Sequence, residues 1–300
     1  MESIVSYPER GNGGRNSYRG NCSPKLIEDI IQQYKIKSLS DYMVGGGTTE
    51  DVCKALGVDG VYLDLNRGFD MIAMDIPERP ENLFWHPPYD DIVVYSDEMY
   101  SAADIEKRFG FDPRVNDLSR CKNYDEFVKA MNYCCMKQFA ALEKGGRMFV
   151  LMGDIKKRGK LYSMLADIIK PGTLEQIIIK AQHNCFSDRT YYSNQNFVPI
   201  VHEYLMVLRK DNSLIIPVKY TKDSAIDARD MKVSTWRDTI VAVMDNYGKT
   251  MTLEELYEKM EGHKKTANNP HWKEKVRQTL QINKKLFKNI ERGKWQLMAA

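Results

Sequence analysis

The sequence predicts an α/β protein in which a large doubly wound domain is followed by a small domain of short helices. Three observations predict it. Strand and helix patterns alternate over roughly the first 200 residues, as expected for parallel strands joined by crossover helices. A glycine-rich turn at residues 45–47 joins a short strand to a helix, and from residue 234 onward the helices become short and closely spaced. We expect domains at 1–218 and 233–300, with a linker at 219–232.

Composition excludes several classes of protein. The chain has 300 residues, of which 43% are hydrophobic and 28% charged, so it can bury a full core. No apolar run is long enough to span a bilayer, and the acidic start Met1-Glu2 is unlike a signal peptide, so we expect a cytoplasmic protein without a membrane partner. The six cysteines show no C-x-x-C spacing and no H-E-x-x-H is present, so neither a metal site nor a disulfide framework is expected.

Charge is unevenly distributed along the chain. From residue 233 to the end there are 13 Lys and Arg against 8 Asp and Glu, whereas the preceding part has 31 against 33. A basic end on a near-neutral body indicates a polyanion partner. The plainer interpretation is a solvated charged surface.

The first elements surround the glycine turn. Residues 1–19 are rich in Gly, Asn, Arg and Ser, and we expect a mobile leader or a loop that orders on ligand binding. Ser23-Pro24 predicts the start of a helix at 25–34. A strand at 38–44 then runs into Gly45-Gly46-Gly47-Thr48, and a helix follows at 50–56. Such turns let a ligand approach the backbone at a helix N-terminus. The absence of a full G-x-G-x-x-G and of G-K-[ST] disfavours a dehydrogenase and a P-loop nucleoside triphosphatase.

Three further predicted strands end in polar residues. The strand at 60–64 ends at Asp64, the strand at 70–74 is followed by Asp75, and the strand at 82–85 is followed by the Pro-Pro turn. The carboxyl ends of parallel strands share one edge of a sheet, and ligands bind there. Asp64 is placed to accept both hydroxyls of a ribose. Each aspartate could instead be a simple strand-end cap.

Residues 86–89 form the turn His86-Pro87-Pro88-Tyr89. Because proline donates no N–H, this turn offers carbonyl oxygens and few donors. It therefore suits a ligand that is itself a donor, such as the exocyclic amine of a nucleobase, and Tyr89 could stack on the ring. The alternative is an ordinary Pro-Pro turn after a buried strand, with Tyr89 in the core.

The remainder of the large domain continues the alternation. We expect helices at 124–142 and 161–169 and strands at 147–152, 174–180 and 202–208. Two polar loops interrupt it: 97–123, with Arg114, and 182–196, with Arg189. Both loops could face a nucleic acid or be plain surface.

The small domain has the element order of a winged helix. Helices are predicted at 236–247 and 252–260, the second opened by a capping box at Thr252, and a third begins with Asn269-Pro270 before a hairpin over 286–298. An apolar stripe on the third helix leaves a polar face that suits a major groove. The residues expected to face DNA are Lys273, Arg277, Gln278, Gln281 and Lys284, with Arg292 near the hairpin tip. A helical protein-interaction module is the alternative.

Taken together, these segments resemble the family of amino-methyltransferases that modify exocyclic amines in DNA with S-adenosylmethionine. Residues 41–49, Asp-Tyr-Met-Val-Gly-Gly-Gly-Thr-Thr, resemble its cofactor motif, and residues 86–89 resemble its catalytic tetrad. Residues 19–24 resemble the short motif that closes over the methionine end of the cofactor. The tail is similar to winged-helix domains of DNA-modification and restriction proteins. The chain departs from the family at His86, where Asp, Asn or Ser is usual.

The resemblance implies roles for single residues. The backbone of Gly45, Gly46 and Gly47 would contact the methionine portion of S-adenosylmethionine, Asp64 the ribose and Asp75 the adenine amine, with Asn21 and Thr48 as further contacts. His86 would accept one amine hydrogen as a neutral imidazole and the Pro87 carbonyl the other, while Tyr89 would stack on a flipped-out base beside Pro88.

The implied activity is methylation of adenine N6 in double-stranded DNA. The alternatives are cytosine N4, RNA instead of DNA, and a DNA-binding regulator without turnover. The sequence leaves open the recognition sequence, a homodimer and a restriction partner.

Overall fold

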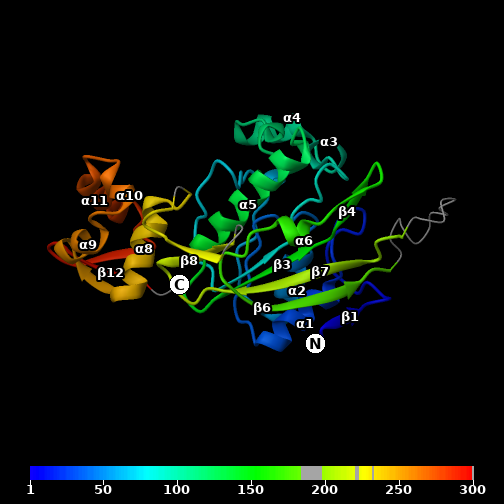
Figure 1. Ribbon diagram of the computed structural model, residues 1–300, viewed down its shortest axis with the longest axis horizontal. Coiled ribbons are helices and arrows are strands. Elements are labelled where there is room, and N and C mark those ends of the chain that lie inside the picture. Colours follow the sequence, from blue (N-terminus) through cyan, green and yellow to red (C-terminus); the bar gives the residue numbers. More distant parts are fainter. Residues whose placement is uncertain (184–197, 220–222, 232, 299–300) are drawn as a thin grey trace.

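The computed structural model describes residues 1–183, 198–219, 223–231 and 233–298, and it confirms the predicted fold class (Figure 1). The central sheet has the strand order β1-β6-β7-β3-β2, in which β1 pairs parallel with β6 and β2 parallel with β3, whereas β7 is antiparallel to both neighbours. Its strands are β1 (Ile4–Ser6), β2 (Asn82–Trp85), β3 (Arg147–Met152), β6 (Thr173–Ala181) and β7 (His202–Arg209).

The predicted strands at 38–44 and 60–64 are extended segments that pair only through single bridges. Ser40 bridges to Leu83 of β2, and Asp41 bridges to Tyr62, both in parallel. The sheet therefore continues beyond β2, and the ends of these segments reach the same edge as the end of β2.

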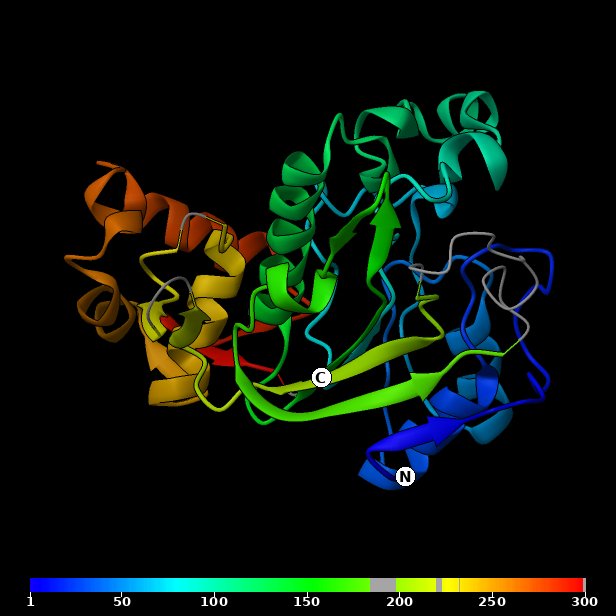
Figure 2. The ribbon, with the colours of Figure 1, turned by 45° about the vertical axis from the view of Figure 1, so that its right-hand side comes forward.

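Helices cover both faces of the sheet. Side chains of a strand alternate between the two faces. Phe84 and Phe149 pack with α1 (Pro24–Tyr34) and α2 (Thr48–Leu56), whereas their neighbours in β2 and β3 pack with α5 (Tyr124–Ala141). Figure 2 shows α5 on one side of the sheet and α1 with α2 on the other. The doubly wound arrangement follows from this two-sided burial.

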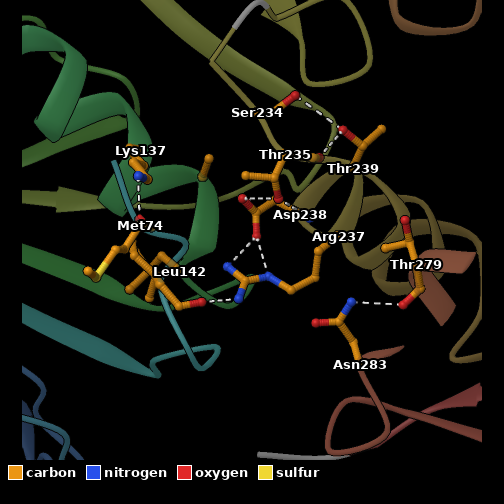
Figure 3. Close-up of polar contacts among 12 residues, drawn as sticks. Met74, Lys137, Leu142, Ser234, Thr235, Arg237, Asp238, Thr239, Thr279 and Asn283 are labelled. Carbon is orange, nitrogen blue, oxygen red and sulfur yellow. Dashed lines mark hydrogen bonds and ion pairs between the residues drawn. The ribbon is translucent and has the colours of Figure 1, made fainter. Parts of the chain in front are cut away.

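The predicted strand at 70–74 is wrong. Asp70 accepts hydrogen bonds from the backbone N–H groups of Ile72 and Ala73, which folds the segment into a turn. Lys137 of α5 donates to the carbonyl oxygen of Met74 at 2.5 Å (Figure 3) and to those of Met71 and Ile72 at 2.8 and 3.2 Å. These carbonyls are satisfied by a buried ammonium group, so no neighbouring strand is needed.

The predicted loop at 97–123 contains regular structure, because side chains a few residues apart cap short helices. Region 97–123 holds α3 (Tyr95–Glu98), α4 (Ala102–Phe109) and the 3₁₀ turns Pro113–Val115 and Leu118–Arg120. Ser101, Asp112 and Asp117 cap the last three of these. Residues 155–162 form a hairpin of β4 (Ile155–Lys157) and β5 (Lys160–Tyr162), and the expected helix at 161–169 is only α6 (Met164–Asp167).

The C-terminal domain has the expected winged-helix order. Its core joins three helices and a small sheet of strand order β10-β12-β11. Thr252 and Glu255 form the predicted capping box, but the third helix begins at Trp272 rather than at Pro270. The elements are α8 (Trp236–Tyr247), β10 (Thr250–Thr252), α9 (Leu253–Met260), α10 (Lys264–Ala267), α11 (Trp272–Ile282), β11 (Phe287–Glu291) and β12 (Lys294–Leu297).

Part of the expected linker is a hairpin of β8 (Ile215–Lys219) and β9 (Asp223–Asp227), so this stretch is not an irregular connection. Leu214 and Ala228, which flank it, are buried in the core of the C-terminal domain.

Buried charged groups join the two domains. Arg79 pairs with Asp245 of α8 at 3.2 Å, and both side chains are more than nine-tenths buried. Arg237 of α8 pairs with Asp238 at 2.9 Å (Figure 3) and donates to the carbonyl of Ile76. Since a buried charge without its partner is costly, these contacts favour one relative placement of the domains. Among the described residues, no helix has the length and apolar character needed to cross a bilayer.

Candidate active site

A cavity lies at the sheet edge where β2 and the two extended segments end. It encloses about 810 Å³ of space, its open mouth included. Seven of the residues predicted from the sequence line it: Asn21, Gly45, Gly46, Thr48, Asp64, His86 and Pro88. Pro87 and Tyr89 line an adjoining groove instead. Gly47 caps the N-terminus of α2 but is outside the lining of the cavity.

The glycine turn is covered by Tyr18 from the N-terminal segment. A Cβ atom on Gly45 or Gly46 would lie 2.8 or 2.9 Å from Tyr18 atoms, closer than such contacts allow. Gly45 also has a φ of +51°, in the left-handed region that favours glycine. The N–H of Arg15 donates to the Gly46 carbonyl at 2.8 Å. Residues 1–19 thus include a strand of the sheet and a wall of the cavity.

Two buried aspartates hold this turn. Asp64 accepts from the N–H groups of Gly45 and Asn66 at 2.8 and 3.0 Å, and burial raises its pKa. Asp41 accepts from the Met43 N–H and the Thr49 hydroxyl, and burial raises its pKa to about 7. Asp64 therefore caps the turn and also lines the cavity, and its contact with a ribose stays a prediction.

Asp75 is exposed and does not line the cavity, because the segment before it is a turn and not a strand. Asn116 and Asp117, between the two 3₁₀ turns, line the cavity instead. Asn116 donates to Asp70 at 2.6 Å, and Asp117 accepts from the N–H of Ser96 at 2.9 Å. The prediction for Asp75 fails together with the strand on which it rested.

The Pro-Pro turn is the wall between the cavity and the groove. The His86 side chain is 12% exposed, and burial lowers its pKa below the ordinary value of 6.5, so the imidazole is neutral at pH 7. Its Nε2 lies 3.0 Å from the Tyr89 hydroxyl, which donates to Glu203 at 2.7 Å. Asp90 ends the turn with a φ of +50° and is bound by Lys157 of β4. A non-glycine residue in this conformation is strained, and the ion pair holds it there.

The groove is wide and basic. It encloses about 2060 Å³ of space, open solvent included, and shares His86, Asn21 and Tyr95 with the cavity. Arg10, Arg19 and Lys180 also line it. Nε and Nη2 of Arg10 are buried and have no hydrogen-bond partner among the described residues. Sequence reasoning missed these residues because nothing in the leader or in β6 marks them locally.

The residues expected to face DNA differ in their surroundings. Lys273, Gln278, Gln281, Lys284 and Arg292 are exposed on α11 and the hairpin. Arg277 is partly buried, and its guanidinium donates to Tyr257 at 3.0 Å and Glu274 at 3.1 Å. Arg114 forms a bidentate pair with Asp112, while Arg189 and loop residues 184–197 lie outside the described residues. All of these assignments stay predictions.

One group of side chains has metal-ligand chemistry. Asp227, Asp230 and His263 bring their ligand atoms within 4.8 Å of one another. However, the guanidinium of Arg229 donates to both carboxylate oxygens of Asp227, so this carboxylate is already paired with a positive side chain.

Comparison with known families matches residues 232–297 to the Dam-replacing HTH domain. No curated protein sequence matches the chain. Similar solved structures include a putative DNA modification methylase from Thermus thermophilus, with 15% identity over 58% of this chain and 53% of that chain and a TM-score of 0.28. TrmN from Thermus thermophilus has 13% identity over 64% and 50%, with a TM-score of 0.30. A SAM-dependent methyltransferase from Archaeoglobus fulgidus has 9% identity over 64% and 96%, with a TM-score of 0.32.

The chain spans about half the length of the first two of these structures. The family match over residues 232–297 agrees with the winged-helix order of elements that the structure has in this region. The chain therefore combines an α/β domain, which carries the cavity, with a C-terminal domain similar to the Dam-replacing HTH domain.

Proposed function

We propose that the protein is an S-adenosylmethionine-dependent DNA methyltransferase acting on an exocyclic amine, with adenine N6 as the target. One observation carries the proposal: His86 lines both a cavity walled by glycines, acids and aromatic rings and a wide basic groove. A ligand in the cavity and a nucleobase in the groove would meet at this turn. The reacting groups are then held together by the rigid Pro-Pro backbone.

The cavity fits S-adenosylmethionine by the chemistry of its walls. Asp64 still has lone pairs for ribose hydroxyls, because each of its oxygens accepts only one N–H group. Thr48 Oγ1 is buried without a hydrogen-bond partner among the described residues, as expected of a group that awaits a ligand. Phe69 and Tyr100 offer apolar surface for a flat ring. When bound, the cofactor supplies an activated methyl group.

The residues of the turn would receive the amine. A neutral His86 accepts one N–H at its free ring nitrogen, and the Pro87 carbonyl accepts the other. Two acceptors fix the plane of the amine and its orientation toward the cavity. Tyr89 lines the groove, where its ring would contact the extruded base.

Double-stranded DNA is the proposed partner. Helix-turn-helix domains place a helix in the major groove, and the exposed basic and amide side chains of α11 suit that position. Arg10 and Arg19 give the catalytic groove positive charge toward a phosphate backbone, whereas Lys180 is paired with Glu203. Cytosine N4 as the target predicts N4-methylcytosine, and binding without turnover predicts no methylated product.

The test uses the full chain, labelled S-adenosylmethionine and plasmid DNA, followed by nuclease digestion and mass analysis. We expect N6-methyladenine, no product from His86→Ala, and unchanged cofactor binding by that variant. His202→Ala, which alters a histidine outside both cavities, is the matched control and should retain activity. N4-methylcytosine would correct the target base. DNA binding without any methylated product would replace the proposal with a non-catalytic regulator.

A further inference from the structure

The hydroxyl of Tyr89 lies between two groups that can both bond to it. Its oxygen is 2.7 Å from Glu203 Oε1 and 3.0 Å from His86 Nε2. A tyrosine hydroxyl has one hydrogen to donate, whereas an ionised carboxylate can only accept. The hydrogen must therefore go to Glu203, since otherwise two oxygen lone pairs would face each other at 2.7 Å. The contact with His86 is then a donation from Nε2–H to the tyrosine oxygen.

Tyr89 donates its hydrogen to Glu203 only when the Glu203 carboxylate is ionised and the Tyr89 hydroxyl is protonated. Glu203 is buried, which opposes ionisation, but Lys180 donates to its Oε2 at 2.7 Å, and the positive charge of Lys180 holds the pKa of Glu203 below its ordinary value. Burial and the neighbouring Glu203 raise the pKa of Tyr89 well above 10. Both conditions are thus met at neutral pH.

The sheet places these groups. Lys180 of β6 and Glu203 of β7 are direct cross-strand partners, and both are less than 10% exposed. Gly153, after β3, leaves room for the tyrosine ring, because a Cβ atom there would lie 3.1 Å from Tyr89 Cε2. The positions of Lys180, Glu203 and Tyr89 are therefore fixed by backbone register and packing, not by flexible surface side chains.

We propose that Lys180, Glu203 and Tyr89 are positioning residues that hold His86 in its Nε2–H form, so that Nδ1 presents the lone pair that receives the target amine. This inference rests on the proposed function for the identity of the ligand. Among the described residues, none hydrogen-bonds to His86 Nδ1.

The same arrangement accounts for the fate of a proton. Once the amine nitrogen carries the transferred methyl group it is positively charged. Its N–H bond then breaks, the electron pair stays on that nitrogen, and an Nδ1–H bond forms on His86, whose ring becomes an imidazolium. Its Nε2–H continues to donate to Tyr89, and the Glu203 carboxylate, 3.9 Å from Nε2, offsets the new positive charge. A histidine in place of the usual carboxylate or amide thus needs a tautomer-setting partner, which Asp, Asn or Ser would not.

The first test reads the tautomer without any turnover. The full chain is labelled with ¹⁵N-histidine, and long-range ¹H–¹⁵N spectra distinguish protonated from unprotonated ring nitrogens, with His86→Asn used for assignment. We expect His86 of the wild type to have a protonated Nε2 and an unprotonated Nδ1. In Tyr89→Phe both signals should move toward the averaged values of exchanging tautomers. Tyr204→Phe, which removes another hydroxyl next to a histidine Nε2, at 2.8 Å, should leave them unchanged.

A protonated Nδ1 in the wild type would overturn the inference, as would unchanged His86 signals in Tyr89→Phe. Glu203→Gln gives a second route, with the same expected shift, if Tyr89→Phe does not fold.

The second test uses kinetics in a double-variant cycle. Tyr89→Phe should lower kcat by about 10- to 100-fold, the range typical of groups that orient a reacting ligand, with KM for DNA little changed. In the His86→Asn background, where no tautomer has to be set, Tyr89→Phe should have no further effect. An equal loss in both backgrounds would show a merely structural role for Tyr89. If the wild type yields no methylated DNA, the proposed function fails. The spectra still decide whether Tyr89 sets the tautomer of His86.

Discussion

Asp41 should make the stability of the protein depend on pH in an unusual direction. Its carboxylate is 3% exposed, and burial raises its pKa from 3.8 to about 7 even though the Thr49 hydroxyl and the Met43 N–H donate to it. The folded state therefore binds this proton more tightly than the unfolded state does. The stability that the protonated carboxyl contributes is fully present below about pH 4 and is lost as the pH rises through about 7.

The size of the effect follows from the shift in pKa. A difference of about three pKa units between the unfolded and folded states corresponds to about 4 kcal/mol at a pH above both values. Asp41→Asn keeps the shape of the side chain and cannot ionise. We expect this variant to match the wild type within about 1 kcal/mol near pH 4 and to exceed it by up to about 4 kcal/mol at pH 8.

Urea unfolding between pH 4 and pH 8, followed by the fluorescence of the four tryptophans, measures this difference. Because the comparison is between two proteins at each pH, titration of other groups cancels. Asp59→Asn, at an exposed position of the neighbouring segment, is the control and should show no comparable gain. A gain that does not change with pH, or a variant less stable than the wild type at pH 8, would refute the reasoning.

Three further predictions concern the cavity, the domain joint and the DNA-facing helix. Gly46→Ala places a Cβ atom 2.9 Å from Tyr18, so it should weaken cofactor binding measured by calorimetry and lower the unfolding free energy by about 1–3 kcal/mol; unchanged binding would contradict the role of this turn. Asp245→Ala leaves Arg79 buried without its partner and should cost about 3–5 kcal/mol in urea unfolding, part of which Arg79→Met should restore in the double variant. Lys273→Ala should reduce the slope of log K for DNA against log salt by about 1 in fluorescence anisotropy, and an unchanged slope would remove this residue from the interface.

The parts of the fold that follow from neighbouring residues could be predicted. Pro24 gives the start of α1 because its ring fixes a helical φ, and the capping box at Thr252 gives the start of α9 because its two groups are three residues apart. Region 70–74 was assigned to the wrong element because its apolar residues pack in a turn whose carbonyls bind Lys137, more than 60 residues away. Local pattern cannot reveal such a partner.

The candidate site was predicted only in part, for a related reason. The glycine turn, Asp64 and the Pro-Pro turn carry their own local signal, and the structure brings members of all three to one cavity: Gly45, Gly46, Asp64, His86 and Pro88. Tyr18 comes from a leader whose composition indicates disorder, and its burial depends on the glycine turn that it covers. A segment that gains its order from a distant partner has no signature in its own residues.

The network around His86 is the strongest case of this dependence. Tyr89 and Glu203 are 114 residues apart, and only the pairing of β6 with β7 brings Lys180 to the same place. Because side chains of a strand alternate, a slip of one residue in β7 would turn Glu203 to the opposite face and leave both Lys180 and the tyrosine hydroxyl without an acceptor. One signal was available, since Glu203 is a buried charge in a strand whose other inward residues are mostly apolar. A buried charge in such a position needs partners. One of the partners of Glu203 is Tyr89, which belongs to the turn between the cavity and the groove.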